Sequence, residues 1–140
     1  MPDFDRENIQ AHELLYRAIL TKNRNWWQDK ANRPTSAIFK CSEAVGAVSV
    51  DRDGGRTLEV IKRNFIKRFN DERQGLLYLR VQCCIDLEVK VTPDLESENI
   101  YHALLTNLNP DQMRITDSKA KKLAMNAVVV KRPEFENTAS

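Results

Sequence analysis

Hydrophobic and polar residues alternate along residues 76–91, LLYLRVQCCIDLEVKV. Every odd position from 77 to 91 is apolar, and most even positions after Leu76 are polar. A period of two is typical of a β-strand with one face on the core and the other in water. Sixteen residues at about 3.3 Å each would span about 53 Å, whereas the radius of gyration of such a domain is only about 14 Å. We therefore expect a long strand that bends, bulges or breaks near Cys83–Asp86.

Two other segments have the 3.6-residue period of amphipathic helices. In residues 56–70 the apolar side comprises Leu58, Ile61, Phe65 and Phe69. In residues 116–127 it comprises Ala120, Leu123, Ala124 and Ala127. The expected caps are Thr57 or Asp53 before the first helix, Gly75 after its end, and Thr116, Asp117 or Ser118 before the second. Both helices are basic on their outer sides.

Shorter apolar runs predict the remaining strands. They are AVGAVSV at 44–50, NIYHALL at 99–105 and VVV at 128–130, the last ended by Pro133. DRDGGR at 51–56 has the composition of a tight turn. Residues 12–20 fit both the period of two of a strand and the 3.6-residue period of a helix, and we favour a strand at 14–19 after a helical turn. The order of these elements predicts one α+β domain over residues 1–140, with a mostly antiparallel sheet whose long bent strand packs against two basic amphipathic helices.

Composition narrows the class of protein. The 140 residues are 41% hydrophobic and 30% charged, as in a soluble globular domain. The net charge of +2 indicates no strong field toward nucleic acid or membranes. Apolar stretches are too short to cross a bilayer, and the polar start MPDFDREN is unlike a signal peptide. Three cysteines, with Cys83 and Cys84 adjacent, favour reduced thiols and a cytoplasmic location.

The common chemical motifs are absent from the sequence. It contains no C-x-x-C, H-E-x-x-H, Walker loop, G-x-G-x-x-G or G-x-S-x-G. Adjacent cysteines also cannot both complete an ordinary tetrahedral zinc site. We therefore expect neither a metal nor a cofactor.

A few residues remain as candidates for a site. Arg17 interrupts the apolar run LLYRAIL, so it needs an anionic partner, which could be Asp51, Asp86 or a bound phosphate. Arg33 and Arg52 could join it around one anion, although DRDGGR also suits a plain surface turn. The catalytic candidates are Arg17, Ser36 and His102.

We expect different environments for the two histidines. His102 lies in a predicted strand, where it is either a hydrogen-bonded core residue or a general base or phosphate contact. His12, near the start of the chain, is expected at the surface.

The basic helices and the adjacent Trp26 and Trp27 raise a further alternative. Two basic helices on one side of the sheet could follow a nucleic-acid backbone, and the tryptophans could stack on bases. The competing interpretation is a solvated helix face and tryptophans that anchor a loop. Because acidic residues nearly cancel the basic ones, nucleic acid is the less favoured partner.

Some segments resemble known proteins. RPTSAIFK, AVSVDR, YHALLTNL and SKAKKLAMNA resemble a scattered group of small bacterial proteins, over residues 14–19, 33–52 and 99–130. In that group an Arg-Pro-[Ser/Thr]-Ser loop precedes a Ser-Val-Asp-Arg strand end, a His-Ala-hydrophobic strand and a Lys/Ala-rich helix. Asn-Ile-Tyr before His102 departs from the Asn-Pro pair of the group, which puts the start of that strand in doubt. The group has no settled activity, so the resemblance implies no substrate.

LLYRAI followed by a hydroxyl-bearing strand also looks like the opening of ADP-ribosyl-transferring folds. In those folds an arginine on the first strand holds dinucleotide phosphates. The resemblance implies that Arg17 holds phosphate and Ser36 faces the ribose, and it places no catalytic glutamate.

Three functions follow as expectations. The first is a small cytoplasmic binding or accessory protein without catalytic activity, which presents residues 33–55 and its helices to a protein partner. The second is an enzyme acting on a phosphate-bearing nucleotide through Arg17, Arg33, Ser36, Arg52 and His102. The third is a weak nucleic-acid-backbone binder. The two leading functions are distinguished by whether Arg17 and His102 line a common cleft with the 33–36 loop.

Overall fold

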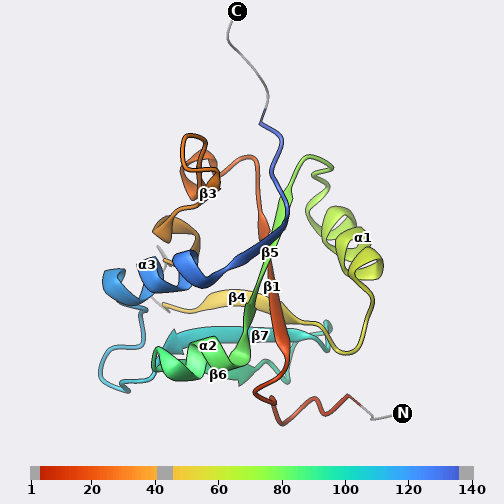
Figure 1. Cartoon of the computed structure of the whole chain (residues 1–140). Helices are drawn as coiled ribbons and strands as arrows, with labels where there is room; N and C mark the ends of the chain where they lie inside the picture. The colour runs from red at the N-terminus through yellow and green to blue at the C-terminus, as the bar shows by residue number, and fades with distance from the viewer. Residues whose placement is uncertain (1–3, 41–45, 136–140) are drawn as a thin grey trace, which may run out of the picture.

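The computed structural model describes residues 4–40 and 46–135 and shows an α+β architecture (Figure 1). Within these residues a six-stranded antiparallel sheet has the order β6-β7-β4-β1-β5-β8. Its strands are β1 Leu14–Ile19, β4 Val48–Arg52, β5 Gly75–Arg80, β6 Val89–Pro93, β7 His102–Asn107 and β8 Val128–Lys131. A small ribbon pairs β2 (Trp27–Gln28) with β3 (Arg33–Pro34). The predicted fold class is confirmed.

The first strand lies in the middle of the sheet. β1 pairs with β4 on one side and with β5 on the other. Leu15 and Ile19 are buried on one face, and Tyr16 and Ala18 on the opposite face. A strand covered on both faces is nearly all apolar, which explains why the sequence of 12–20 fitted two periods. The predicted strand at 14–19 is confirmed.

Residues 76–91 do not form one long strand. β5 ends at Arg80, a short helix α2 occupies Val81–Asp86, and β6 begins at Val89. The break covers the region where the irregularity was predicted. Val81 and Cys84 are buried one helical turn apart on the same side of α2. Alternation would have placed Cys84, at an even position, on the outer face of a strand. The left-handed Glu88, with φ of 57°, then turns the chain into β6.

The predicted helices are confirmed as α1 (Leu58–Phe69) and α3 (Asp117–Asn126). The side chains of Thr57 and Thr116 accept hydrogen bonds from backbone N–H groups of the first turns, as their sequence positions predicted. The end of α1 differs from the prediction. Asn70 takes the left-handed position, with φ of 51°, and Gly75 instead begins β5.

The remaining strand predictions hold in part. β8 confirms the strand at 128–130. β7 begins at His102, because Asn99 and Tyr101 belong to the preceding turn. β4 confirms the end of the strand predicted at 44–50, whose positions 44 and 45 lie outside the described residues.

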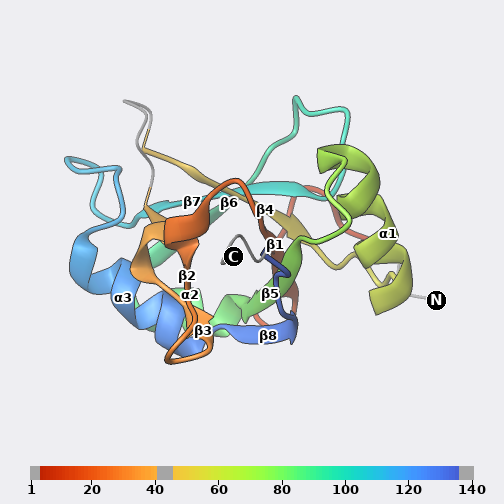
Figure 2. The same ribbon diagram turned by 90° about the horizontal axis from the view of Figure 1, so that it is seen from above.

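The two basic helices lie on opposite faces of the sheet (Figures 1 and 2). α3 packs with α2 and the short helix η2 (Ser36–Phe39) over a core that includes Leu15, Ile38, Phe39, Leu77, Leu105 and Leu123. α1 covers the other face through Ile61 and Phe65, which contact Tyr16, Ala18 and Leu76. α1 and α3 therefore do not share one side of the sheet, as the nucleic-acid alternative required.

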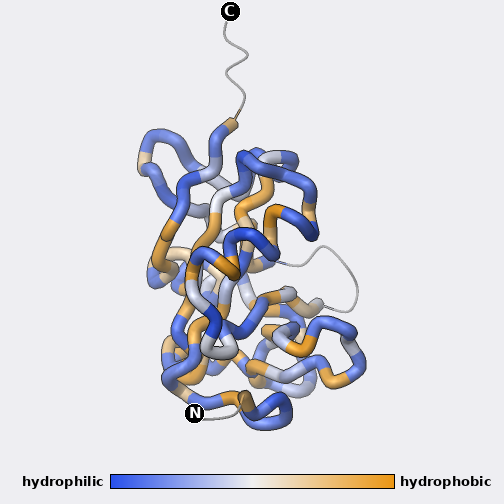
Figure 3. Tube along the Cα trace, turned by 90° about the vertical axis from the view of Figure 1, so that its right-hand side faces the viewer, coloured by the Kyte–Doolittle hydropathy of each residue, from blue (hydrophilic) through white to orange (hydrophobic). Residues whose placement is uncertain are grey.

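Hydrophobic positions gather in the strands and on the inward sides of the helices, while the connecting loops are mostly hydrophilic (Figure 3). Within the two described ranges, no helix has the length and apolar character needed to span a membrane.

Candidate functional site

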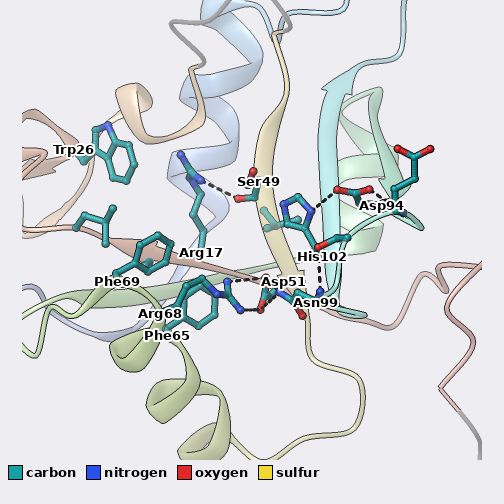
Figure 4. A pocket seen from close by; sticks show the side chains of 15 residues that line it. Arg17, Trp26, Ser49, Asp51, Phe65, Arg68, Phe69, Asp94, Asn99 and His102 are labelled. Carbon is teal, nitrogen blue, oxygen red and sulfur yellow. Dashed lines mark hydrogen bonds and ion pairs between the residues drawn. The ribbon is translucent and has the colours of Figure 1, made fainter.

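A cavity of about 650 Å³ lies beside α1, on the face of the sheet that α1 covers (Figure 4). α1 covers β1 and β5 and leaves β4 and β7 as the cavity floor. Residues 94–99 form the far wall, and the short helix η1 (Arg24–Trp26) contributes Trp26. The polar lining consists of Arg17, Ser49, Asp51, Arg68, Asp94, Glu96, Ser97, Asn99 and His102. The aromatic lining consists of Trp26, Phe65 and Phe69.

Strand alternation decides which side chains reach the cavity. In β4, Val48 and Val50 point into the α3-side core, so Ser49 and Asp51 point the other way. In β7, Ala103 enters the same core. His102 therefore faces the cavity and lies directly opposite Asp51 on the neighbouring strand.

Arg17 lies where β1 and β4 separate. These strands pair only at Leu15–Arg52 and Tyr16–Asp51. Beyond that point the guanidinium of Arg17 bridges the gap: its Nε donates to the Ile38 carbonyl and its Nη1 to the Ser49 carbonyl, each at 2.8 Å. It also lies 4.8 Å from the ring centre of Trp26. The arginine thus replaces backbone hydrogen bonds at the opening of the sheet.

Asp51 joins three parts of the site. Its side chain is 2% exposed and accepts two hydrogen bonds from Arg68 of α1, at 2.8 and 3.2 Å. Asn99 Nδ2 donates to the same carboxylate at 3.1 Å, and Arg56 Nη2 lies 4.0 Å away. Burial lowers the pKa of the Arg56 guanidinium below its ordinary value, although the nearby Asp51 opposes that shift. Asp51 therefore fixes α1 and the 99–101 turn to the floor of the cavity.

His102 forms a carboxylate–imidazole pair with Asp94. The His102 Nδ1 and Asp94 Oδ2 atoms are 2.8 Å apart, and both side chains are partly exposed. The hydrogen bond with His102 lowers the pKa of Asp94 below its ordinary value of 3.8. His102 thus is hydrogen-bonded, as the core interpretation required, and also lines a cavity, as the functional interpretation required.

The other sequence candidates lie elsewhere. Arg52 is 1% exposed, and its guanidinium binds Glu13 and backbone carbonyls of the N-terminal segment. Arg33 is exposed on β3, and Ser36 begins η2; neither lines the cavity. The structure therefore brings together Arg17 and His102, without Arg33, Ser36 and Arg52.

The two tryptophans lie in different environments, one as expected for anchoring a loop and the other at the cavity. Trp27 is 4% exposed and packs in the core, which agrees with anchoring of a loop. Trp26 is partly exposed and lines the cavity. His12 is exposed, as expected.

In the part of the chain that the structure describes, no group of three or more histidine, cysteine or acidic residues could hold a metal ion. Comparison with family models, curated proteins and solved structures finds no match to this chain.

Asp94→Asn is expected to destabilise the protein at neutral pH but not in acid. The folded-state pKa of Asp94 is lowered, so its carboxylate stabilises the fold above pH 3.8 and loses that effect as the pH falls below this value. Urea unfolding at pH 7, 5 and 3 should show the difference from wild type shrinking with acidity. Asp111→Asn, at an exposed position, is the control. A difference in unfolding free energy that stays constant with pH would show that the ionised Asp94 carboxylate is not what stabilises the fold.

Proposed function

We propose that this protein binds a phosphate-bearing nucleotide in the cavity beside α1. The observation that carries the proposal is the convergence of Arg17, Arg68 and His102 with aromatic rings around one space of about 650 Å³. Small-ligand pockets commonly have about 300–1,000 Å³, an apolar lining and a few convergent polar groups.

The cationic end of the cavity suits a phosphate. Arg17 donates to two carbonyl acceptors, which orient its guanidinium. A guanidinium held in one place can present paired N–H donors to phosphate oxygens at a smaller cost in side-chain entropy. His102, whose ring lies beside Ser49 on the adjoining strand, supplies a further donor when protonated (Figure 4).

The remaining lining favours a nucleotide over a bare phosphate. Trp26 and Phe69 offer ring faces, and stacking of a base on an aromatic side chain contributes about 1–3 kcal/mol. Asp94 and Glu96 at the far wall are acceptors for hydroxyl groups such as those of ribose. A ligand with an anionic group, a planar ring and hydroxyls matches all three surfaces.

We further propose a cytoplasmic location. Cys83 and Cys84 are free thiols, and burial raises the pKa of Cys84 to about 12. Unbridged thiols of this kind are typical of a reducing compartment.

Calorimetric titration with ADP, ADP-ribose, NAD and inorganic phosphate tests the proposal. At least one nucleotide should bind more tightly than phosphate, and Arg17→Met should weaken its binding at least tenfold. Phe69→Ala, at a side chain 41% exposed, should weaken the nucleotide but not phosphate, because it removes only a ring face.

Arg33→Met is the matched control, since Arg33 is exposed outside the cavity. It should leave the dissociation constant within twofold. Thermal unfolding of each variant separates lost binding from lost folding. Absence of binding by every nucleotide, or equal losses in Arg17→Met and Arg33→Met, would overturn the proposal.

A further inference from the structure

The Asp94–His102 pair has the geometry of an oriented base. A carboxylate oxygen 2.8 Å from Nδ1 requires the ring hydrogen on that nitrogen. Asp94 is ionised at neutral pH, since its ordinary pKa of 3.8 already lies far below 7 and the hydrogen bond with His102 lowers it further. The lone pair of the neutral imidazole therefore lies on Nε2, the nitrogen on the side of the ring away from Asp94. Figure 4 shows the ring between Asp94 and Ser49, beside the cavity.

Arg17 and His102 approach the same short stretch of β4. Arg17 binds the Ser49 carbonyl, and His102 faces the cavity opposite Asp51, two residues along that strand. A group bound above Ser49 would thus lie between a fixed cation and an imidazole base. Phosphoryl transfer needs this combination, because a base activates the nucleophile while cations stabilise charge on the phosphoryl oxygens.

We propose that the protein hydrolyses the pyrophosphate bond of the nucleotide it binds, with His102 as the general base. This inference rests on the proposed function above. His102 Nε2 takes a proton from water as the water oxygen forms a bond to phosphorus. The bond from phosphorus to the bridging oxygen breaks, and the proton passes from His102 to the departing phosphate. One pyrophosphate and one water thus give two phosphates.

Two other residues have defined parts in this reaction. Arg17 contacts the phosphoryl group and stabilises the charge that develops on it. Asp94 does not touch the substrate; it is a positioning residue that holds the imidazole in the required tautomer.

The experiment follows ADP and ADP-ribose by chromatography, with binding measured on the same samples by calorimetry. Wild type should release AMP from both, and water labelled with oxygen-18 should place one label in a product phosphate. The ADP analogue with a methylene bridge should bind without being cleaved, because a carbon bridge cannot depart. His12→Gln, which removes the exposed imidazole, should retain the full rate.

Variants of His102 and Asp94 separate the role of the general base from that of the positioning residue. His102→Gln should lower kcat at least 100-fold with a dissociation constant within threefold of wild type. His102→Gly should recover activity when imidazole is added. Asp94→Asn should lower kcat about tenfold and displace the acidic limb of the pH–rate profile, which a merely structural role would leave in place.

The outcomes distinguish the two proposals. Tight binding without any cleavage by wild type would overturn the hydrolytic role and leave nucleotide binding standing. Cleavage that persists in His102→Gln would overturn the role of His102. Absence of binding by both nucleotides would overturn the hydrolytic role together with the binding function.

Discussion

Arg52→Ala is expected to lower the free energy of unfolding by about 3–5 kcal/mol, the usual cost of removing one partner of a buried ion pair. Arg52 is 1% exposed, and its Nε and Nη2 bind both oxygens of Glu13 at 2.7 and 3.0 Å. Its Nη1 donates to the carbonyl of Arg6, and its Nη2 also donates to the carbonyls of Asp5 and Asn8. The variant leaves Glu13, whose side chain is 10% exposed, without its partner and frees the N-terminal segment.

Urea unfolding of Arg52→Ala, Glu13→Gln and the double variant Arg52→Met/Glu13→Leu checks this result. The double variant should recover much of the loss, because hydrophobic residues of similar volume can replace a buried ion pair at little cost. Hydrogen exchange should also quicken at residues 5–8 in Arg52→Ala alone. A loss below about 1 kcal/mol, the range of an exposed pair, would show that Arg52 is not the anchor described.

Asp51→Ala is expected to cost about 3 kcal/mol, near the lower end of the range for a broken buried pair, because Arg68 is partly exposed and can be rehydrated. The variant removes the acceptor shared by Arg68 and Asn99. α1 and the 99–101 turn should both loosen, so nucleotide binding in the cavity should weaken as well.

Chemical unfolding together with hydrogen exchange tests this second expectation. Amide protons of α1 should exchange faster in Asp51→Ala, while those of α3 on the opposite face should not. Glu59→Ala is the control on the same helix, since Glu59 forms an exposed pair with Lys62 and should cost less than about 1 kcal/mol. Equal losses in the two variants would contradict the role given to Asp51.

Local sequence patterns predicted most of the fold. Thr57 and Thr116 marked helix starts because a cap depends on residues three positions apart. The alternation over 76–91 was misleading because a six-residue helix buries Val81 and Cys84 together, whereas a strand would place an odd and an even position on opposite faces. Nothing local indicated that β5 and β6 lie far apart in the sheet, since strand order depends on distant pairings.

The site was predictable only in part, for the same reason. Arg17 stood out because a charge within an apolar strand needs a partner, and Asp51 was considered only as one possible partner for it. In the structure the Asp51 carboxylate binds Arg68 and Asn99. Asp94 carries no such signal, because its approach to His102 depends on the turn between β6 and β7. Arg52 was expected beside a bound anion or in a surface turn, because nothing local indicated its pairing with Glu13, which lies 39 positions away.

The position of β1 has a consequence for how the chain reaches its final state. Among the described strands β1 precedes the others in the chain and is central in the sheet, whereas its neighbours at 48–52 and 75–80 follow later and β8 pairs with β5 later still. The apolar segment Leu14–Ile19 therefore has no sheet to join until both neighbours have been synthesised. Assembly of the sheet should be slow, as distant strand pairings require, and until then the unpaired β1 is a site at which the chain could aggregate.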